Sequence, residues 1–164
     1  MRPHRIAGAD RGVPGDLSGA LACLPLPLDT ARVRIYRAGC GGAAGVTHRL
    51  VLRLSRGRAL ALGNRVFLPA RCDADLAVLA HELTHCAQYQ SWGPLRYYVR
   101  GAAAQLRDVV HRLLGVGPSP YVWRAEPGKR FEAYGMEQQG QIVEDAVRGH
   151  PIARAIANRP ATPA

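Results

Sequence analysis

Five consecutive residues near the middle of the chain, His81-Glu82-Leu83-Thr84-His85, constrain its fold more than any other feature. Two histidines four residues apart lie one turn apart on the same side of an α-helix, where both can bind one metal ion. Neutral imidazole is a good ligand for zinc. Glu82 stands about 100° round the helix from His81, so it can reach water on the ion without entering the ligand set. The run therefore predicts a metal-binding helix with an acid/base residue beside the metal.

The residues around this run predict a helix with one apolar face. At about 100° per residue from His81, an apolar group falls roughly between 160° and 260°, whereas His85, Val78 and Gln88 fall near zero. The apolar group consists of Leu76, Leu79, Ala80, Leu83 and Ala87. We expect this face to pack into a core and the histidine face to look away from it. Asp73 is the predicted N-terminal cap, and the helix is expected to run through Gln90.

The order of the predicted elements, strands first and helices afterwards, indicates an α+β domain. The expected architecture is a small antiparallel or mixed N-terminal sheet, followed by the metal-binding helix and further helices. Alternating or apolar patterns predict strands at 31–37, 48–54 and 59–68, the last bent at Gly63-Asn64. Caps and helical periodicity predict helices at 73–90, 95–114 and 136–147.

Segments rich in proline and glycine, which interrupt helices and strands, indicate the domain boundaries. Residues 1–30 are rich in both and are expected to be irregular, apart from a short helix around 16–23. Residues 31–149 form the predicted domain around the metal-binding helix. Residues 150–164 are rich in alanine and proline and are expected to be a disordered tail.

The charge of the chain favours a basic surface over a nucleic-acid site. The net charge is +10, and all of the 22 basic residues except Lys129 are arginines. These arginines are scattered, and no aromatic residues interleave with them as a base-stacking surface would need. A nucleic-acid binder therefore rests on charge alone and is the weaker alternative, and we expect no specific nucleic-acid partner.

The remaining composition predicts a protein of a reducing compartment. No apolar run is long enough to span a bilayer, and basic residues at the start are not followed by the apolar core of a signal peptide. Cys23, Cys40, Cys72 and Cys86 lack the close spacing of zinc or redox motifs and are expected to be thiols. We expect a cytoplasmic location, with export open to a secretion system that needs no signal peptide.

A zinc ion held by two histidines needs a third protein ligand and an open position for water. Residue type leaves five candidates for the third ligand. They are Glu132, Glu137, Glu144, Asp145 and His111. The residues alone do not choose among them, although Glu137 lies near the start of a predicted helix from which it can point at His81 and His85.

Three segments give the chain a more specific likeness. The segment 79–97 around the metal-binding run, the preceding 61–67 and the later 137–145 resemble the small metallopeptidase domain of extracellular contractile injection systems, to which domains of Vgr-type spike-associated proteins are related. The likeness covers about residues 31–148 and is weak before 59. Gly140 departs from it, since alanine is expected there, and Cys86 stands in place of a bulkier apolar residue. The resemblance implies a zincin-like fold, zinc as cofactor and Glu137 as third ligand.

The predicted function is a zinc metalloendopeptidase linked to a contractile injection or type VI-like secretion system. It would hydrolyse peptide bonds with zinc-activated water and with Glu82 as general base. Tyr134 is a candidate donor to the oxyanion, as are Tyr89, His111 or a nearby arginine. The expected partners are a peptide or protein substrate and secretion-system components. The alternative is a weakly active or inactive zincin-fold adaptor that binds a secretion-system partner.

Overall fold

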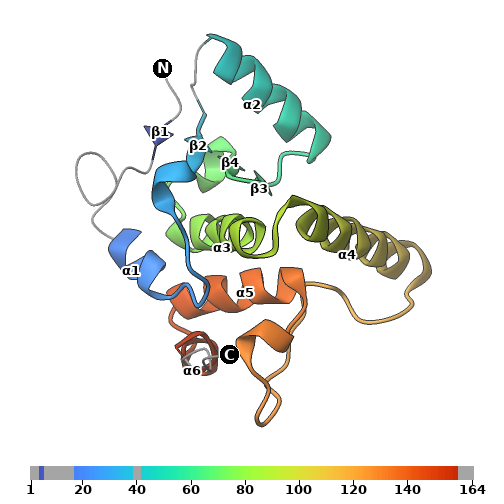
Figure 1. Ribbon diagram of the computed structural model, residues 1–164. Coiled ribbons are helices and arrows are strands. Elements are labelled where there is room, and N and C mark those ends of the chain that lie inside the picture. Colours follow the sequence, from blue (N-terminus) through green and yellow to red (C-terminus); the bar gives the residue numbers. More distant parts are fainter. Residues whose placement is uncertain (1–3, 6–16, 39–41, 159–164) are drawn as a thin grey trace.

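The computed structural model describes residues 4–5, 17–38 and 42–158 and confirms the predicted α+β class (Figure 1). The strands are β1 (His4–Arg5), β2 (Arg34–Tyr36), β3 (Leu60–Leu62) and β4 (Arg65–Phe67). The α-helices are α1 (Leu17–Ala22), α2 (Gly42–Leu54), α3 (Leu76–Trp92), α4 (Pro94–Leu114), α5 (Met136–Val147) and α6 (Pro151–Ala157). Short 3-10 helices are η1 (Thr30–Arg32), η2 (Ala70–Cys72) and η3 (Phe131–Ala133).

The sheet is mixed, as predicted, with strand order β1-β2-β4-β3. The outer pairs are antiparallel and the central pair, β2 with β4, is parallel. Ile35 pairs with Val66 and Tyr36 pairs with Phe67. Because successive strand residues point to opposite faces, the two pairs occupy opposite faces of the sheet. β3 is left as an edge strand.

α3 lies between two apolar cores. Figure 1 shows α2 on one side of the sheet and α3 on the other, with α5 and then α6 beyond α3. Leu79, Leu83 and Cys86 of α3 pack against Ile35 and Val66 of the sheet, as the predicted apolar face requires. On its other side α3 faces α5, and a second core joins α3, η3, α5 and α6. The members of this second core include Ala80, Phe131, Ile142, Val143 and Ile156.

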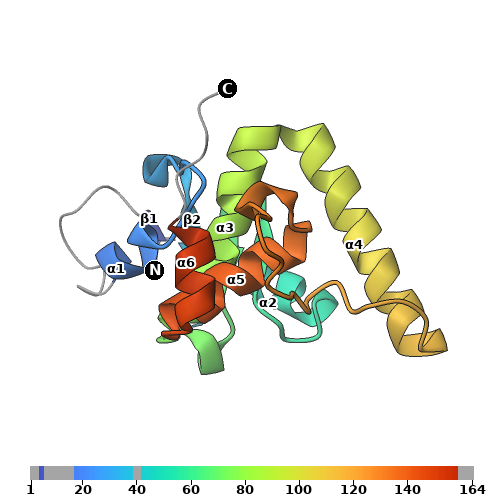
Figure 2. The same ribbon diagram turned by 90° about the horizontal axis from the view of Figure 1, so that it is seen from below.

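Local signals explain the two ends of α3. Asp75, rather than the predicted Asp73, caps it by accepting hydrogen bonds from the backbone N–H groups of Ala77 (3.0 Å) and Val78 (3.1 Å). Gly93 ends α3 at φ 76°, a conformation that glycine adopts without strain, and Pro94 begins α4 at once. α4 then runs outward, and its C-terminal end lies well away from α3 and α5 (Figure 2).

The predicted strand at 48–54 is wrong, because these residues belong to helix α2. Gly45 and His48 are buried on one side of that helix, and Leu52 is partly buried one turn further on. This spacing is helical rather than alternating. The buried His48 donates a hydrogen bond from Nε2 to the carbonyl oxygen of Leu68, 2.8 Å away, and so fastens α2 beside the end of β4. The helix begins at Gly42, six residues before the predicted strand.

The predicted disordered tail is wrong for residues 151–157, which form α6. Its small apolar residues, Ala153, Ile156 and Ala157, recur at helical spacing and are buried in the second core. Pro151 suits the first position of a helix. The short helix predicted around 16–23 is confirmed as α1, whereas the rest of the tail, 159–164, and Cys40 lie outside the described residues.

The described cysteines are Cys23, Cys72 and Cys86, and all three are free thiols, as expected. Cys86 is fully buried in the core beneath the sheet. Among the described helices, none combines the length and the apolar character needed to cross a bilayer.

Replacement of Ile156 by alanine tests whether α6 belongs to the folded domain. Ile156 is 4% exposed, and removing a buried isoleucine side chain costs about 2–5 kcal/mol of unfolding free energy. We expect a loss in this range by urea denaturation. Ile152→Ala is the matched control, because Ile152 is 49% exposed and its loss is expected to cost less than about 0.5 kcal/mol. Equal stability of both variants and the parent would mean that α6 adds nothing to the core.

Candidate metal centre

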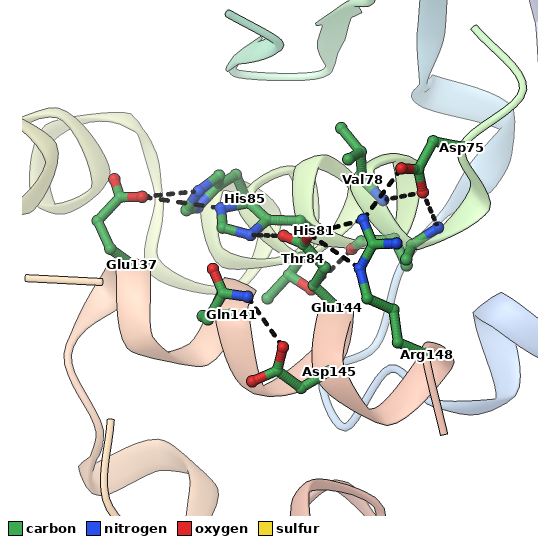
Figure 3. Close-up of polar contacts among 12 residues, drawn as sticks. Asp75, Val78, His81, Thr84, His85, Glu137, Gln141, Glu144, Asp145 and Arg148 are labelled. Atoms are coloured by element: carbon green, nitrogen blue, oxygen red, sulfur yellow. Dashed lines mark hydrogen bonds and ion pairs between the residues drawn. The ribbon is translucent and has the colours of Figure 1, made fainter. Parts of the chain in front are cut away.

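α3 and α5 bring three metal-ligand side chains together, as Figure 3 shows. Oε2 of Glu137 lies 3.7 Å from Nε2 of His81 and 3.5 Å from Nε2 of His85. One ligand atom from each residue lies within 4.8 Å of the other two. Tetrahedral zinc places its nitrogen and oxygen ligands about 3.3–3.5 Å apart. The three residues therefore fit a single metal ion, and the structure places Glu137 where the resemblance implied a third ligand.

The ring of His81 is oriented by a chain of charged groups. Its Nδ1 donates to Oε2 of Glu144 at 3.1 Å, which leaves Nε2 facing Glu137. Arg148 donates to Glu144 and to Asp75, at 3.0 Å in each case. Asp75 in turn caps α3 (Figure 3). Glu144, one of the predicted candidates for the third ligand, therefore binds Nδ1 of His81, the ring nitrogen that faces away from Glu137. Hydrogen-bond partners in this position fix the tautomer and the orientation of a metal-binding histidine ring.

Two glutamine amides orient the ring of His85. The Nε2 of Gln88 donates to the carbonyl oxygen of Met136 (3.1 Å) and to Oε1 of Gln139 (2.9 Å). Because a carbonyl can only accept, this fixes the amide of Gln88 with its oxygen toward His85, whose Nδ1 donates to it at 2.8 Å. The Nε2 of Gln139 donates to the carbonyl oxygen of Tyr134 at 2.9 Å. Nε2 of His85 is thereby left free to face the metal.

The arrangement favours positive charge between the two helices. Burial opposes the charging of His81, but its hydrogen bonds to Glu137 and Glu144 outweigh burial and raise the pKa of His81 to about 10. Burial also acts to raise the pKa of Glu137, yet the facing rings of His85 and His81 hold that pKa well below its usual range. A divalent cation is a natural occupant of such a place.

Glu82 lies beside the ligands with one oxygen unpaired. Its Oε2 is buried and has no hydrogen-bond partner among the described residues. Buried polar atoms are nearly always paired, so this one indicates a missing polar neighbour. Burial raises the pKa of Glu82, although His81 and His85 act in the opposite direction. The raised pKa makes this carboxylate a stronger base than an ordinary glutamate.

Gly140 allows the two helices to approach closely. A Cβ atom at this position would lie 2.7 Å from Nε2 of His81 and 2.9 Å from its Cδ2 and Cε1. Real Cβ contacts are not that short, so any larger residue must displace the ring or the helix. The departure from alanine noted in the sequence thus has a physical cause in this chain: the imidazole of His81 occupies the space of the missing methyl group.

Three of the other ligand candidates lie elsewhere. Asp145 accepts a hydrogen bond from Nε1 of Trp123 at 2.8 Å. His111, near the end of α4, is hydrogen-bonded through Nδ1 to the carbonyl oxygen of Gly117 at 2.8 Å. Glu132 is exposed on η3. The metal-ligand cluster found in the described part of the chain contains none of these residues.

Tyr134, the predicted oxyanion donor, lines a neighbouring groove and is not among the residues that line the cavity of His81, His85 and Glu137. Its hydroxyl donates to the carbonyl oxygen of Arg124 at 3.2 Å. Tyr89 instead packs against Tyr97 and Tyr98. The cavity has a volume of about 500 Å³, and the three ligands and Glu82 lie on its wall. Tyr121 also lines it. Burial raises the pKa of Tyr121, so its hydroxyl remains protonated and able to donate.

Substitution of Gly140 by alanine tests the close helix contact. The added methyl group would push the ring of His81 from its position against Glu137, and disturbed support of a ligand typically lowers metal affinity about 10-fold to 100-fold. We expect a loss of this size in titrations against a competing chelator. Gln141→Ala is the control, because Gln141 on the same helix bonds to Asp145 instead. Unchanged affinity in Gly140→Ala would show that the contact is not needed for the metal site.

Comparison with known families gives one match. The family model of the eCIS core domain matches residues 41–93, which is less than half of the chain. No curated protein matches the chain, and no solved structure does. The matched stretch includes α2, the β3–β4 hairpin and α3 with His81, Glu82 and His85, and it ends before Glu137. Residues 41–93 are therefore related to the eCIS core domain, and this relation associates the chain with extracellular contractile injection systems.

Proposed function

We propose that the protein is a zinc-dependent metallopeptidase that works with a contractile injection system. One observation carries the proposal: two histidines and a glutamate converge on one point, and Glu82 has an unpaired buried oxygen on the same cavity. Two imidazoles and one carboxylate are a ligand set of catalytic zinc sites, which keep a further position open. The association with injection systems comes from the match over residues 41–93.

Each residue of the site has its own role in the proposed reaction. His81, His85 and Glu137 would hold the metal, and Glu144 and Gln88 would keep the two rings in the correct tautomer. A bound zinc ion supplies a Lewis acid that polarises the substrate carbonyl and lowers the pKa of water. Glu82 would take the proton from the attacking water and pass it to the leaving amine.

Tyr121 is the best-placed candidate to stabilise the oxyanion. It lines the cavity together with Glu82 and Glu137, and its raised pKa keeps the hydroxyl protonated. A donor aimed at the developing negative charge is usually worth a large factor in rate. This role replaces the one expected for Tyr134, whose hydroxyl is bonded to the backbone at Arg124.

The position of β3 supports a peptide substrate. β3 is an edge strand, and all three of its residues line the cavity that holds the metal ligands. Exposed strand edges bind extended peptides through main-chain hydrogen bonds. The carbonyl oxygen of Ala61 already accepts a hydrogen bond from the hydroxyl of Tyr97 at 3.0 Å. A substrate would therefore rely on other main-chain groups at this edge.

Zinc content and cleavage test the proposal together. Elemental analysis of the purified protein should give about one zinc per chain, the number that one set of three protein ligands can hold. His85→Ala and Glu137→Ala should lose the zinc, because each removes a ligand. Glu82→Gln should keep it and lose peptide cleavage about 10²-fold to 10⁴-fold, as the loss of a general base does. Cleavage is read by mass spectrometry on a peptide library made from a digested proteome.

The outcomes separate an enzyme from a binding module. Absence of zinc in the parent after incubation with the metal would refute a metallopeptidase. Zinc bound through the three ligands, with identical cleavage patterns for parent and Glu82→Gln, would favour the zincin-fold adaptor.

Tyr121→Phe tests the oxyanion donor on a peptide cleaved by the parent. Loss of the hydroxyl should lower kcat about 10²-fold, as removal of an oxyanion donor does, while zinc content stays the same. Tyr98→Phe is the matched control, because Tyr98 lines the same cavity but is 49% exposed on α4. An equal decrease of kcat in both variants, or no decrease in Tyr121→Phe, would mean that another group is the oxyanion donor.

A further inference from the structure

The outward face of α4 is apolar, which is the reverse of an ordinary surface helix. Tyr97 and Asp108 are the buried residues of α4 and lie on its inner side. At about 100° per residue, the residues opposite them form what we call the outer seam. The outer seam consists of Leu95, Val99, Ala102, Leu106, Val109 and Leu113. Leu95, Leu106 and Leu113 are 79%, 64% and 77% exposed. Helices of globular proteins normally turn such residues inward.

The spacing of the outer seam fits another helix. Its members follow one another at intervals of four, three, four, three and four residues, which is the pattern of the two apolar positions of a heptad repeat. This pattern presents a narrow straight ridge to a second helix. α4 has 21 residues, so the ridge is about 30 Å long. A partner helix of three heptads would cover it.

The charges beside the seam select the kind of helix. Arg96 and Arg112 occupy the positions next to the seam, one on each flank, and Arg100 and Arg107 lie further round the helix on the side of Arg96. Asp108 is the single acidic residue of α4, and it is buried and paired with Arg112 at 2.9 Å. A second copy of the chain would bring no acidic side chain to either flank. Acidic flanks would complement these arginines, as they do between paired coiled-coil helices.

A groove lies beside the outer seam, so this surface of α4 is partly concave. A cavity of about 900 Å³ lies between α4 and the segment that follows it. Arg100, Arg107 and Val110 line it from α4, and Val116 and Pro118 line it from the other side. The charged residues on its α4 wall are arginines, and Glu132 and Glu137 also line the groove. A concave site of this kind accepts side chains from a helix, whereas a flat bilayer surface does not enter it. The groove reaches Met136 and Glu137 and so adjoins the metal centre.

We propose that the outer seam of α4 is a docking surface for an acidic amphipathic helix of a partner protein. Leucine-like side chains of the partner would cover the seam, and glutamates or aspartates beside them would face the arginines. Ala102 of the seam also lines the cavity that holds the metal ligands, whereas the other members of the seam do not. The proposal does not depend on whether the protein hydrolyses peptides.

Synthetic peptides test this docking directly. The probe is a 21-residue helix with leucine at the two apolar heptad positions and glutamate beside them, and its matched partner has lysine in place of glutamate. Fluorescence anisotropy should show the glutamate peptide binding at least about 10-fold more tightly than the lysine peptide. The difference in affinity between the two peptides should become smaller as the salt concentration rises, because salt screens the charges. The double variant Arg100→Glu, Arg107→Glu should reverse the preference.

Variants of exposed leucines show where the peptide binds. Leu106→Asp should weaken binding of the glutamate peptide at least about 10-fold, because a charge would stand in the apolar ridge. Leu54→Asp is the matched control on α2, where Leu54 is 77% exposed, and it should bind as the parent does. Both variants should keep the parent's thermal unfolding and metal content, which separates docking from the metal centre.

Four results would overturn the proposal. The first is equal binding of the glutamate and lysine peptides, and the second is normal binding by Leu106→Asp. The third is a dimer of the parent in sedimentation that Leu106→Asp dissolves, since that would assign the seam to a second copy. The fourth is binding to phosphatidylserine vesicles that Leu106→Asp abolishes while the peptides do not bind, since that would assign it to a membrane.

Discussion

The contact between the ring of His81 and the backbone of Gly140 sets the spacing on which the rest of the structure depends. Where a side chain would normally stand, α5 offers open backbone, and the imidazole fills that space. This close approach puts Glu137 at the near nitrogen of the ring and Glu144 at the far one. The two glutamates are seven residues apart, about two helical turns, so they lie on one face of α5 on either side of Gly140.

Burying polar groups costs free energy, and α3 limits this cost by keeping its apolar and its polar side chains on opposite sides of the helix. Leu79 and Leu83 pack against the sheet in a wholly apolar core. The opposite side of α3 carries the histidines, whose nitrogens are paired with side chains of α3 and α5. Buried charges are tolerated when each has such partners, and breaking one pair leaves the other group unpaired. The sheet therefore stabilises the fold, and α5 completes the polar site.

Sequence predicted the parts of the structure that depend on local signals. The limits of α5 were predicted as observed, and those of α3 and α4 to within a few residues, because Gly93 and Pro94 act on their own neighbours. The spacing of His81 and His85 predicted one helix face for both. α2 was mistaken for a strand because its outer face is apolar, so its burial pattern is hidden in the sequence.

Contacts between segments that are distant in the sequence could not be predicted from the residues alone. Glu137 was one of five candidates, and only a resemblance singled it out, because nothing local shows that α5 crosses α3. The pairing of Gln88 with Gln139 spans 51 residues, and Gly140 shows its purpose only against the ring of His81. The burial of α6 likewise depends on apolar residues of α5, so Ile156 looks like part of a loose tail in the sequence.

The junction at Gly93 has a mechanical consequence. α4 begins directly after the metal-binding helix, with a single residue between Trp92 and Pro94. A joint this short gives α4 the behaviour of a lever fixed to α3 rather than of a domain on a flexible tether. A molecule held on α4 would therefore be kept at a set distance and angle from the cavity. Any part of that molecule that reaches the cavity would therefore do so at a raised effective concentration, without any further contact.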